Sequence, residues 1–190
     1  MPKVSHERKT ERREQILSGA RRCFAAYGYE GATVARLEEE IGLSRGAIFN
    51  YFPSKEDLFL ELAFRDNERI LRLWLEHGWA AALRSIVEED PDWLGVYLEV
   101  ARKTRSNPDF ARRHEERADK EITPLVIEAI RADQERGAIR GDFPPERVAG
   151  FISIVANGVV VQMASGERIS DVDALVEFVR TAIDASTPRK

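Results

Sequence analysis

The sequence has little cysteine and no recognisable leader. Its 190 residues include one cysteine, Cys23, so an internal disulfide is excluded. The first nine residues are polar and charged, and they lack the apolar segment and small-residue cleavage site of a signal peptide. No repeat or low-complexity tract is present. These absences favour a folded protein of the cytoplasm over a secreted, disulfide-linked one.

Residues for metal binding and catalysis are also scarce. The chain has three histidines, none of which follows a glutamate by three residues or another histidine by four. Cys23 falls on an apolar helical face, which favours a core position. The acidic run at residues 88–92 lacks the spaced ligands and central glycine of a calcium loop. We therefore predict that the chain is not an enzyme and holds no metal or cofactor.

The sequence contains one long uncharged segment, at residues 148–166. This segment has the length of a membrane span but carries serine, asparagine and glutamine side chains. We interpret it as a buried helix and expect no membrane partner.

Charge is unevenly distributed along the chain. The net charge of −4 combines +3 over residues 1–55 with −7 over residues 56–190. A basic head on an acidic body indicates that a polyanion would meet the head. A chance fluctuation in a charged surface would give the same distribution.

Apolar residues recur with helical spacing nearly throughout, and alternating β-branched runs are missing. We predict an all-α fold of about nine helices, with an N-terminal three-helix head and a larger helical body. The first helix should close at Gly28. Its apolar face consists of Ile16, Ala20, Cys23, Phe24 and Tyr27.

Two short helices are predicted next. Thr33 can cap the first, which carries Leu37 and stops at Gly42, and Ser44 can cap the second, at residues 45–51. A helix ended by glycine, a short turn and a helix opened by serine are typical of a DNA-reading helix-turn-helix. The N-terminus of the second helix offers free N–H groups and a positive dipole end to phosphate.

A capping box at residues 54–57, Ser-Lys-Glu-Asp, is expected to open a long fourth helix that links head to body. Pro124 should kink or restart a later helix, with Thr123 as its cap. Further helices are expected at residues 79–87, 93–104, 110–130, 148–163 and 172–183.

A dense motif runs through the head. Gly31, Thr33 and Leu37 precede the stretch Gly-Leu-Ser-Arg-Gly-Ala-Ile-Phe-Asn-Tyr-Phe-Pro-Ser-Lys-Glu-Asp-Leu at residues 42–58. Over residues 12–71 this pattern resembles the TetR family of bacterial regulators. The resemblance implies a DNA-binding domain at residues 1–57, and an effector-binding and dimerisation domain at residues 58–190. It also implies a dimeric repressor that a small-molecule effector releases from double-stranded operator DNA.

Short segments of the chain further resemble the actinobacterial regulators of aconitase expression, which implies control of aconitase or other central-carbon genes. They lie at residues 21–25, 28–34, 36–39 and 44–49, with a weaker likeness at 92–93 and 98–99. Two positions depart from the wider family. Asn50-Tyr51 replaces an aromatic followed by histidine, and Glu38 replaces a small residue. Glu38 is shared with the aconitase regulators and should face Arg36, Arg45 or solvent.

The motif supplies candidate DNA contacts. Arg45 and Asn50 could read base edges, because arginine binds guanine and asparagine binds adenine in a bidentate way. The small residues Gly46 and Ala47 let the backbone approach the groove. Candidates for phosphate contacts are Thr33, Ser44, Tyr51 and Lys55.

Each phosphate candidate also has an ordinary structural explanation. Thr33 and Ser44 could be caps only, Tyr51 could be packed, and Lys55 could be a solvated lysine. The basic residues at positions 8, 9, 12 and 13 could form a minor-groove arm or a solvated terminus.

Two apolar helices close the chain. The family resemblance implies that they pair with their copies in a four-helix homodimer interface, although they could instead fill the core of a monomer. The predicted interface residues are Val148, Phe151, Ile152, Val155, Val159, Val160, Met163, Leu175, Phe178 and Val179.

The family also implies a ligand pocket lined by residues 93–104 and 110–130. Arg105 falls within an apolar helical arc and Arg102 at its edge, so both are candidates to bind a di- or tricarboxylate effector. Arg105 could instead interact favourably with the helix dipole or pair with Glu99 or Asp109 at the surface. The rival function for the whole chain is a helical scaffold protein whose head binds protein, and salt-sensitive duplex binding would separate the two.

Overall fold

The structure is a computed structural model that describes residues 6–89 and 91–185. The described residues form ten helices, and their only β-pairing is an isolated bridge between Ile139 and Asp184. The all-α prediction is thus confirmed. The helices are α1 (His6–Gly31), α2 (Val34–Ile41), α3 (Arg45–Phe49), α4 (Lys55–His77), α5 (Trp79–Val87), α6 (Pro91–Ser106), α7 (Pro108–Glu121), α8 (Thr123–Glu135), α9 (Pro145–Ala164) and α10 (Val172–Ile183).

The helix expected at residues 110–130 is divided, and this division accounts for the tenth helix. Pro124 lies in the first turn of α8, where its missing N–H removes no helical hydrogen bond. The predicted cap is wrong: Ile122 occupies the N-cap position, Thr123 is already helical, and no side chain caps α8.

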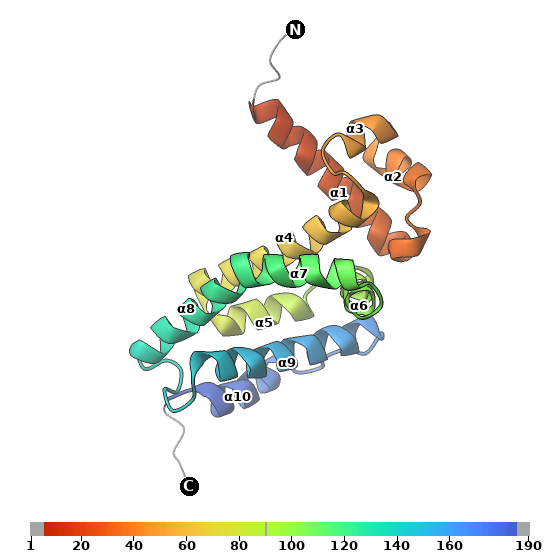
Figure 1. Cartoon of the computed structure of the whole chain (residues 1–190). Coiled ribbons are helices and arrows are strands. Elements are labelled where there is room, and N and C mark those ends of the chain that lie inside the picture. The colour runs from red at the N-terminus through yellow and green to blue at the C-terminus, as the bar shows by residue number, and fades with distance from the viewer. Residues whose placement is uncertain (1–5, 90, 186–190) are drawn as a thin grey trace.

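Helices α1, α2 and α3 form a head at one end of the molecule, and α4 runs from the head into the body (Figure 1). The last two helices, α9 and α10, lie on the side of the body opposite the head (Figure 1). Helix α9 packs against α5, α6 and α8. This arrangement separates the predicted DNA-reading surface from the C-terminal helices.

Helix α1 continues through a kink at Gly28, which has φ 66° and ψ 176°. Only glycine adopts such a conformation readily, so the kink requires a glycine at position 28. Tyr27 is 45% exposed, which corrects its predicted place on the buried face. Tyr29, just past the kink, is buried instead and packs against the rings of Phe24 and Phe59 at centroid distances of 6.0 and 4.8 Å.

The apolar side chains gather in two clusters. The first fills the head and its junction with α6 and includes Phe24, Leu37 and Ile48. The second fills the body and includes Trp74 and Ile130. Burying each such side chain stabilises the fold by about 1.5 to 3 kcal/mol. The core of the head is therefore continuous with apolar residues of α4, α6 and α7.

Helix α9 is, within the described residues, the one helix long and apolar enough to cross a membrane by length and composition. Its mean hydropathy reaches 1.5, and 22% of the residues in that apolar window are buried inside the chain. A core helix of a globular protein passes the same test. The expectation of a buried helix is therefore wrong for the single chain: α9 packs against α5, α6 and α8 on one side, but most of its apolar window stays exposed or half-buried.

Candidate nucleic-acid interface

The turn between α2 and α3 is built by local caps. The Thr33 hydroxyl accepts a hydrogen bond from the Arg36 N–H at 3.4 Å, and the Ser44 hydroxyl accepts one from the Ala47 N–H at 3.4 Å. Gly42 ends α2 in the left-handed region, at φ 72°. The predicted caps at Thr33 and Ser44 are therefore confirmed. Capping does not exclude phosphate contacts, since a hydroxyl oxygen that accepts from the backbone keeps its own O–H donor.

The recognition helix α3 is anchored by one side chain. Ile48 is 0% exposed and packs in the same core as Leu37 and Ile41 of α2. Helix α1 approaches α2 closely at Gly19, where a Cβ would lie 2.8 Å from the Cα of Ile41. This packing fixes the orientation of a helix only five residues long.

The opposite side of α3 is open. Arg45, Gly46 and Asn50 are exposed, and Ala47 is half-buried. A Cβ added to Gly46 would meet no atom within 4 Å, so nothing in the described chain covers this turn. Arg45, Gly46 and Ala47 therefore lie at the accessible N-terminal end of α3, and Asn50 lies at its C-cap.

Glu38 joins the two helices of the motif. Its carboxylate accepts a hydrogen bond from the backbone N–H of Arg45 at 2.6 Å. An acidic group at a helix N-terminus is favourable, because the first N–H groups lack intrahelical partners. The departure from the family pattern is thus compatible with the motif, and Glu38 contacts Arg45 through its backbone rather than its guanidinium.

Lys55 and Tyr51 lie at the base of the head, and both are half-buried. The Lys55 ammonium donates to the Tyr29 carbonyl at 2.8 Å and lies 4.3 Å from the centroid of the Tyr29 ring. Burial lowers the pKa of Lys55. Tyr51 packs against the head core. Lys55 is therefore not the freely solvated lysine of the alternative interpretation.

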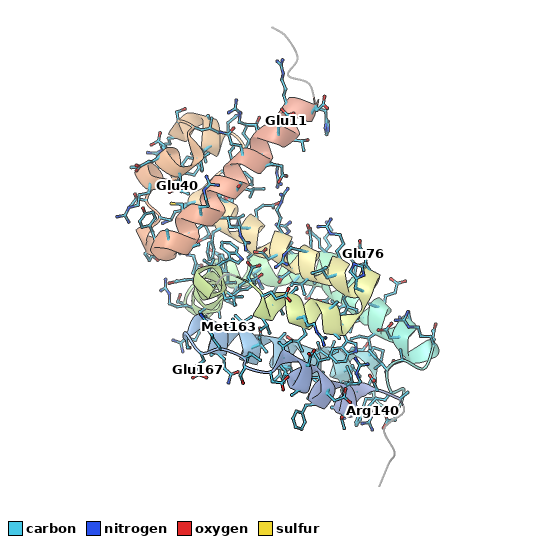
Figure 2. All side chains as sticks on the ribbon, turned by 180° about the vertical axis from the view of Figure 1, so that it is seen from behind. Glu11, Glu40, Glu76, Arg140, Met163 and Glu167 are labelled. Carbon is cyan, nitrogen blue, oxygen red and sulfur yellow. The ribbon has the colours of Figure 1, made fainter. Side chains whose placement is uncertain are left out.

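The basic N-terminal residues lie on helix α1. Residues 8, 9, 12 and 13 are all helical, so either a minor-groove arm or a solvated terminus would be the end of a helix here. Figure 2 shows this part of α1, marked by Glu11, extending beyond the other head helices. Arg13 pairs with Glu61 of α4 at 2.5 Å, and Arg12 donates to Gln15 at 2.9 Å.

A partly buried ion cluster, with Asp66 as its buried member, joins the head to the body. Arg21 of α1 lies 2.9 Å from Asp66 and 2.9 Å from Glu89, and its guanidinium carbon lies 3.9 Å from the ring centroid of Trp93 on α6. Burial raises the pKa of Asp66, while Arg21 and Arg69 oppose that rise. These contacts tie α1, α4 and α6 together.

A second junction surrounds Lys103, a side chain of α6 that sequence patterns did not single out. It is 9% exposed, and its ammonium lies 3.2 Å from Glu56 and 4.0 Å from the centroid of the Tyr29 ring. Arg113 of α7 also pairs with Glu56, at 3.2 Å. Because Tyr29 contacts both Lys55 and Lys103, the base of the head is bonded directly to α6.

The two arginines predicted to bind an effector do not face a cavity. Arg102 and Arg105 are exposed, and Arg102 pairs with Glu99 at 2.9 Å and with Glu30 at 3.3 Å. The helical arc was misplaced because α6 buries Trp93, Val96 and Val100 against the head and body. The expectation that Arg105 faces a cavity is therefore wrong.

The body contains a partly open cavity of about 310 Å³ between α4, α5, α6, α9 and the start of α8. Its lining is largely apolar and includes the aromatic residues Trp74, Trp79 and Tyr97. Burial raises the pKa of Tyr97, so its hydroxyl stays neutral. Of the predicted pocket segments, residues 93–104 contribute Tyr97, and residues 110–130 contribute Ile122 and Val126.

The predicted dimer residues divide into inward and outward sets. Val148, Val159, Met163 and Val179 are buried in the chain's own core, so their assignment to the interface is corrected. Half-buried residues that pack on that core are Ile152, Val155, Val160 and Leu175. The outward set from the prediction consists of Phe151 and Phe178, which are 39% and 78% exposed.

Two further outward residues were missed by the sequence reasoning. Ile154 of α9 is 73% exposed, and Val161 is 48% exposed. Helix α9 is apolar around most of its circumference, so periodicity alone could not tell which side faces the core. The spacing of seven between these residues, with Gly158 between them, was the available signal for a second apolar face.

Family models match both parts of the chain. Residues 16–62 match the model for bacterial regulatory proteins of the tetR family, and residues 72–188 match the C-terminal model for BetI-type transcriptional repressors. The chain is 39% identical to the HTH-type transcriptional repressor Rv1474c of Mycobacterium tuberculosis, covering 98% of this chain and 100% of that protein. It is 37% identical to the HTH-type transcriptional repressor AcnR of Corynebacterium diphtheriae, covering 99% and 100%.

Solved structures share the fold. Salmonella enterica GusR superimposes with a TM-score of 0.74 at 21% identity, over 95% of this chain and 98% of that chain. A transcriptional regulator from Saccharomonospora viridis, determined in complex with choline, gives a TM-score of 0.63 at 27% identity, over 90% and 94%. The chain belongs to the TetR family of bacterial regulatory proteins, and it is a DNA-binding transcriptional regulator rather than an enzyme.

Proposed function

We propose that this chain is a dimeric repressor that binds a palindromic operator in the cytoplasm and is released from it by a small-molecule effector. The observation that carries the proposal is the recognition helix α3, which is anchored by Ile48 and leaves Arg45, Gly46 and Asn50 accessible. The full-length likeness to proteins named as transcriptional repressors supports repression rather than activation.

In this proposal Arg45 and Asn50 read base edges in the major groove. Gly46 and Ala47 allow the backbone to approach, and phosphate contacts come from Thr33, Ser44, Tyr51 and Lys55. Lys55 has three N–H donors and uses one on the Tyr29 carbonyl, which leaves donors for a phosphate.

The proposed dimer forms through the outward face of α9 and α10. Phe151, Ile154, Val161 and Phe178 expose large apolar side chains there. A second copy of the chain is the proposed occupant, because a symmetric pair would cover the same residues on both copies and present two recognition helices to successive major grooves.

The proposed targets are aconitase or other central-carbon genes. The support is the likeness of the head segments to aconitase regulators and the 37% identity to a repressor named AcnR. A di- or tricarboxylate effector fits that regulation. Such an acid would bind outside the apolar cavity, because none of the described lining residues is basic.

Selection of duplexes from a random library by the purified full chain tests this function. We expect enrichment of a palindrome with half-sites about one helical turn apart, and binding that weakens steeply as salt rises. Light scattering on the free protein should give the mass of two chains. Recovery of no preferred sequence, together with salt-independent retention of duplex, would instead support the scaffold function.

A further inference from the structure

Lys103 lies in the body but belongs to the surroundings of a proposed phosphate contact, Lys55. It is 9% exposed, so it offers almost no surface to a duplex. A buried lysine is uncommon and needs a partner of opposite charge. Its partner is Glu56 in the first turn of α4, at 3.2 Å. Lys103 therefore joins α6 to the helical turn that begins with Lys55.

The same ammonium also contacts Tyr29. It lies 4.0 Å from the centroid of the Tyr29 ring and 5.5 Å from that of Phe110. A cation near an aromatic face is favourable, and more so where water is partly excluded. Burial raises the pKa of Tyr29, and the charge of Lys103 opposes that rise. The two side chains are thus coupled both by contact and by charge.

Tyr29 in turn binds the ammonium of Lys55. Its carbonyl accepts a hydrogen bond from Lys55 at 2.8 Å, and its ring centroid lies 4.3 Å from the same ammonium. The local backbone alone does not fix this carbonyl, because Tyr29 follows the kink at Gly28 and glycine is conformationally permissive. The contacts of the Tyr29 ring with α1, α4 and α6 therefore decide where Lys55 is held.

Arg113 of α7 holds the first turn of α4 as well. It pairs with Glu56 at 3.2 Å and also with Asp57. Glu56 therefore keeps a partner of opposite charge when Lys103 loses its ammonium. A variant of Lys103 can thus change the support of Tyr29 without leaving a carboxylate unpaired.

We infer that Lys103 is a positioning residue, which fixes the Lys55 ammonium for a DNA phosphate without touching the DNA. A lysine side chain is flexible, so restricting it before binding lowers the entropic cost of the phosphate contact. Lys55 uses one of its three N–H donors on the Tyr29 carbonyl and keeps the others for phosphate. The consequence for operator binding rests on the proposed function, whereas the restraint on Lys55 does not.

The salt dependence of duplex binding tests the consequence for DNA. Each phosphate contact that is lost lowers the slope of log affinity against log salt concentration by about one. Because the proposed dimer carries two copies of Lys55, Lys103→Met should lower the slope by about two and weaken operator and random duplex by the same factor. Lys103→Arg, which keeps a cation that can pair with Glu56, should restore the wild-type slope.

Arg117→Met is the matched control. Arg117 also joins the body to α4, since it pairs with Glu61 at 3.0 Å and lies 4.2 Å from the centroid of the Phe64 ring. This pair lies beyond the first turn of α4, so the salt slope should stay that of the wild type. In the Lys55→Gln background, Lys103→Met should change affinity by less than about twofold, because the group that it positions is already gone.

Lysine-selective NMR of the free protein tests the restraint without DNA. The Lys55 signal is identified by its absence from Lys55→Gln, and the ring current of Tyr29 should displace it in the wild type. In Lys103→Met it should move toward the signals of exposed lysines such as Lys120. Thermal melts verify that each variant folds.

An unmoved Lys55 signal in Lys103→Met overturns the positioning role. So does an unchanged salt slope in a Lys103→Met protein that binds duplex, or an equal fall of the slope in Arg117→Met. A wild-type protein that binds no duplex refutes the repressor function, and the NMR comparison then still decides whether Lys103 restrains Lys55.

Discussion

The head and the body use apolar side chains in opposite ways. In the head, Leu37 and Ile48 are fully buried and the outward surface of α3 is polar or small. In the body, Phe178 and Ile154 are mostly exposed, and a cavity remains between the helices. The head buries its large apolar side chains within the single chain and exposes polar or small residues at α3. The body leaves apolar surface that a second copy and a ligand can cover.

The largest expected effect comes from placing a charge on the outward face of α9. Ile154→Glu should convert the proposed dimer to a monomer at micromolar concentration, because association would bury an unpaired carboxylate on each copy. Operator binding should be lost with it. Light scattering and gel retardation measure the two effects.

Leu75→Glu is the matched control for this experiment. Leu75 is also exposed, at 58%, but lies on α4 rather than on α9 or α10. It should leave both mass and operator binding unchanged. An Ile154→Glu protein that remains dimeric would place the interface elsewhere on the body.

Truncation of a side chain in the head core should remove operator binding but leave the dimer intact. Ile48→Ala is expected to destabilise the head by about 2 to 5 kcal/mol, because its side chain is fully buried in the head core. Operator binding should fall sharply while the protein remains a dimer. Thermal unfolding and light scattering measure this, with Glu39→Ala on the exposed side of α2 as the control. Loss of the dimer in Ile48→Ala would show that head and body do not fold separately.

A smaller effect is expected at the reading surface. Arg45→Ala should cost about 1 to 3 kcal/mol on the selected operator and little on random duplex, because a bidentate base contact is lost. Lys55→Gln should weaken both duplexes alike, because a phosphate contact carries no sequence information. Competition binding at fixed salt measures the difference. Equal losses on both duplexes for Arg45→Ala would remove it from the base-reading residues.

The same contrast explains which features the sequence predicted well. Caps at Thr33 and Ser44 and the stop at Gly42 are local signals, because each residue acts within three or four positions of itself. The contacts of Glu38 and Lys103 were harder to predict from sequence, since their partners lie on other helices. Whether a carboxylate meets a helix N-terminus depends on tertiary packing that spacing does not encode.

Prediction in the body failed where helix faces were ambiguous. Helix α9 is apolar on two sides, so Val159 was assigned to the dimer although it is buried in the chain's own core, and Ile154 was missed. Arg105 was placed in a cavity because its helical arc was apolar, whereas α6 turns that residue to solvent. The faces of a helix that packs on several neighbours are decided by those neighbours.

The smallest predicted effect is a dependence of stability on pH, which arises where α7 packs against α4. His114 of α7 is half-buried, with ring centroids 5.4 Å from Phe64 and 6.3 Å from Phe110. Burial lowers the pKa of His114 below its ordinary value of about 6.5, and Glu115 opposes this only in part. The folded protein thus holds the neutral imidazole, and the unfolded chain takes up the proton first as pH falls. Stability should be constant above about pH 7 and decrease as pH falls through about 6.5.

Thermal melts between about pH 8 and pH 5 measure this decrease, which His114→Gln should make shallower. His77→Gln, at the exposed end of α4, is the matched control. An unchanged pH profile in His114→Gln would assign the dependence to other groups.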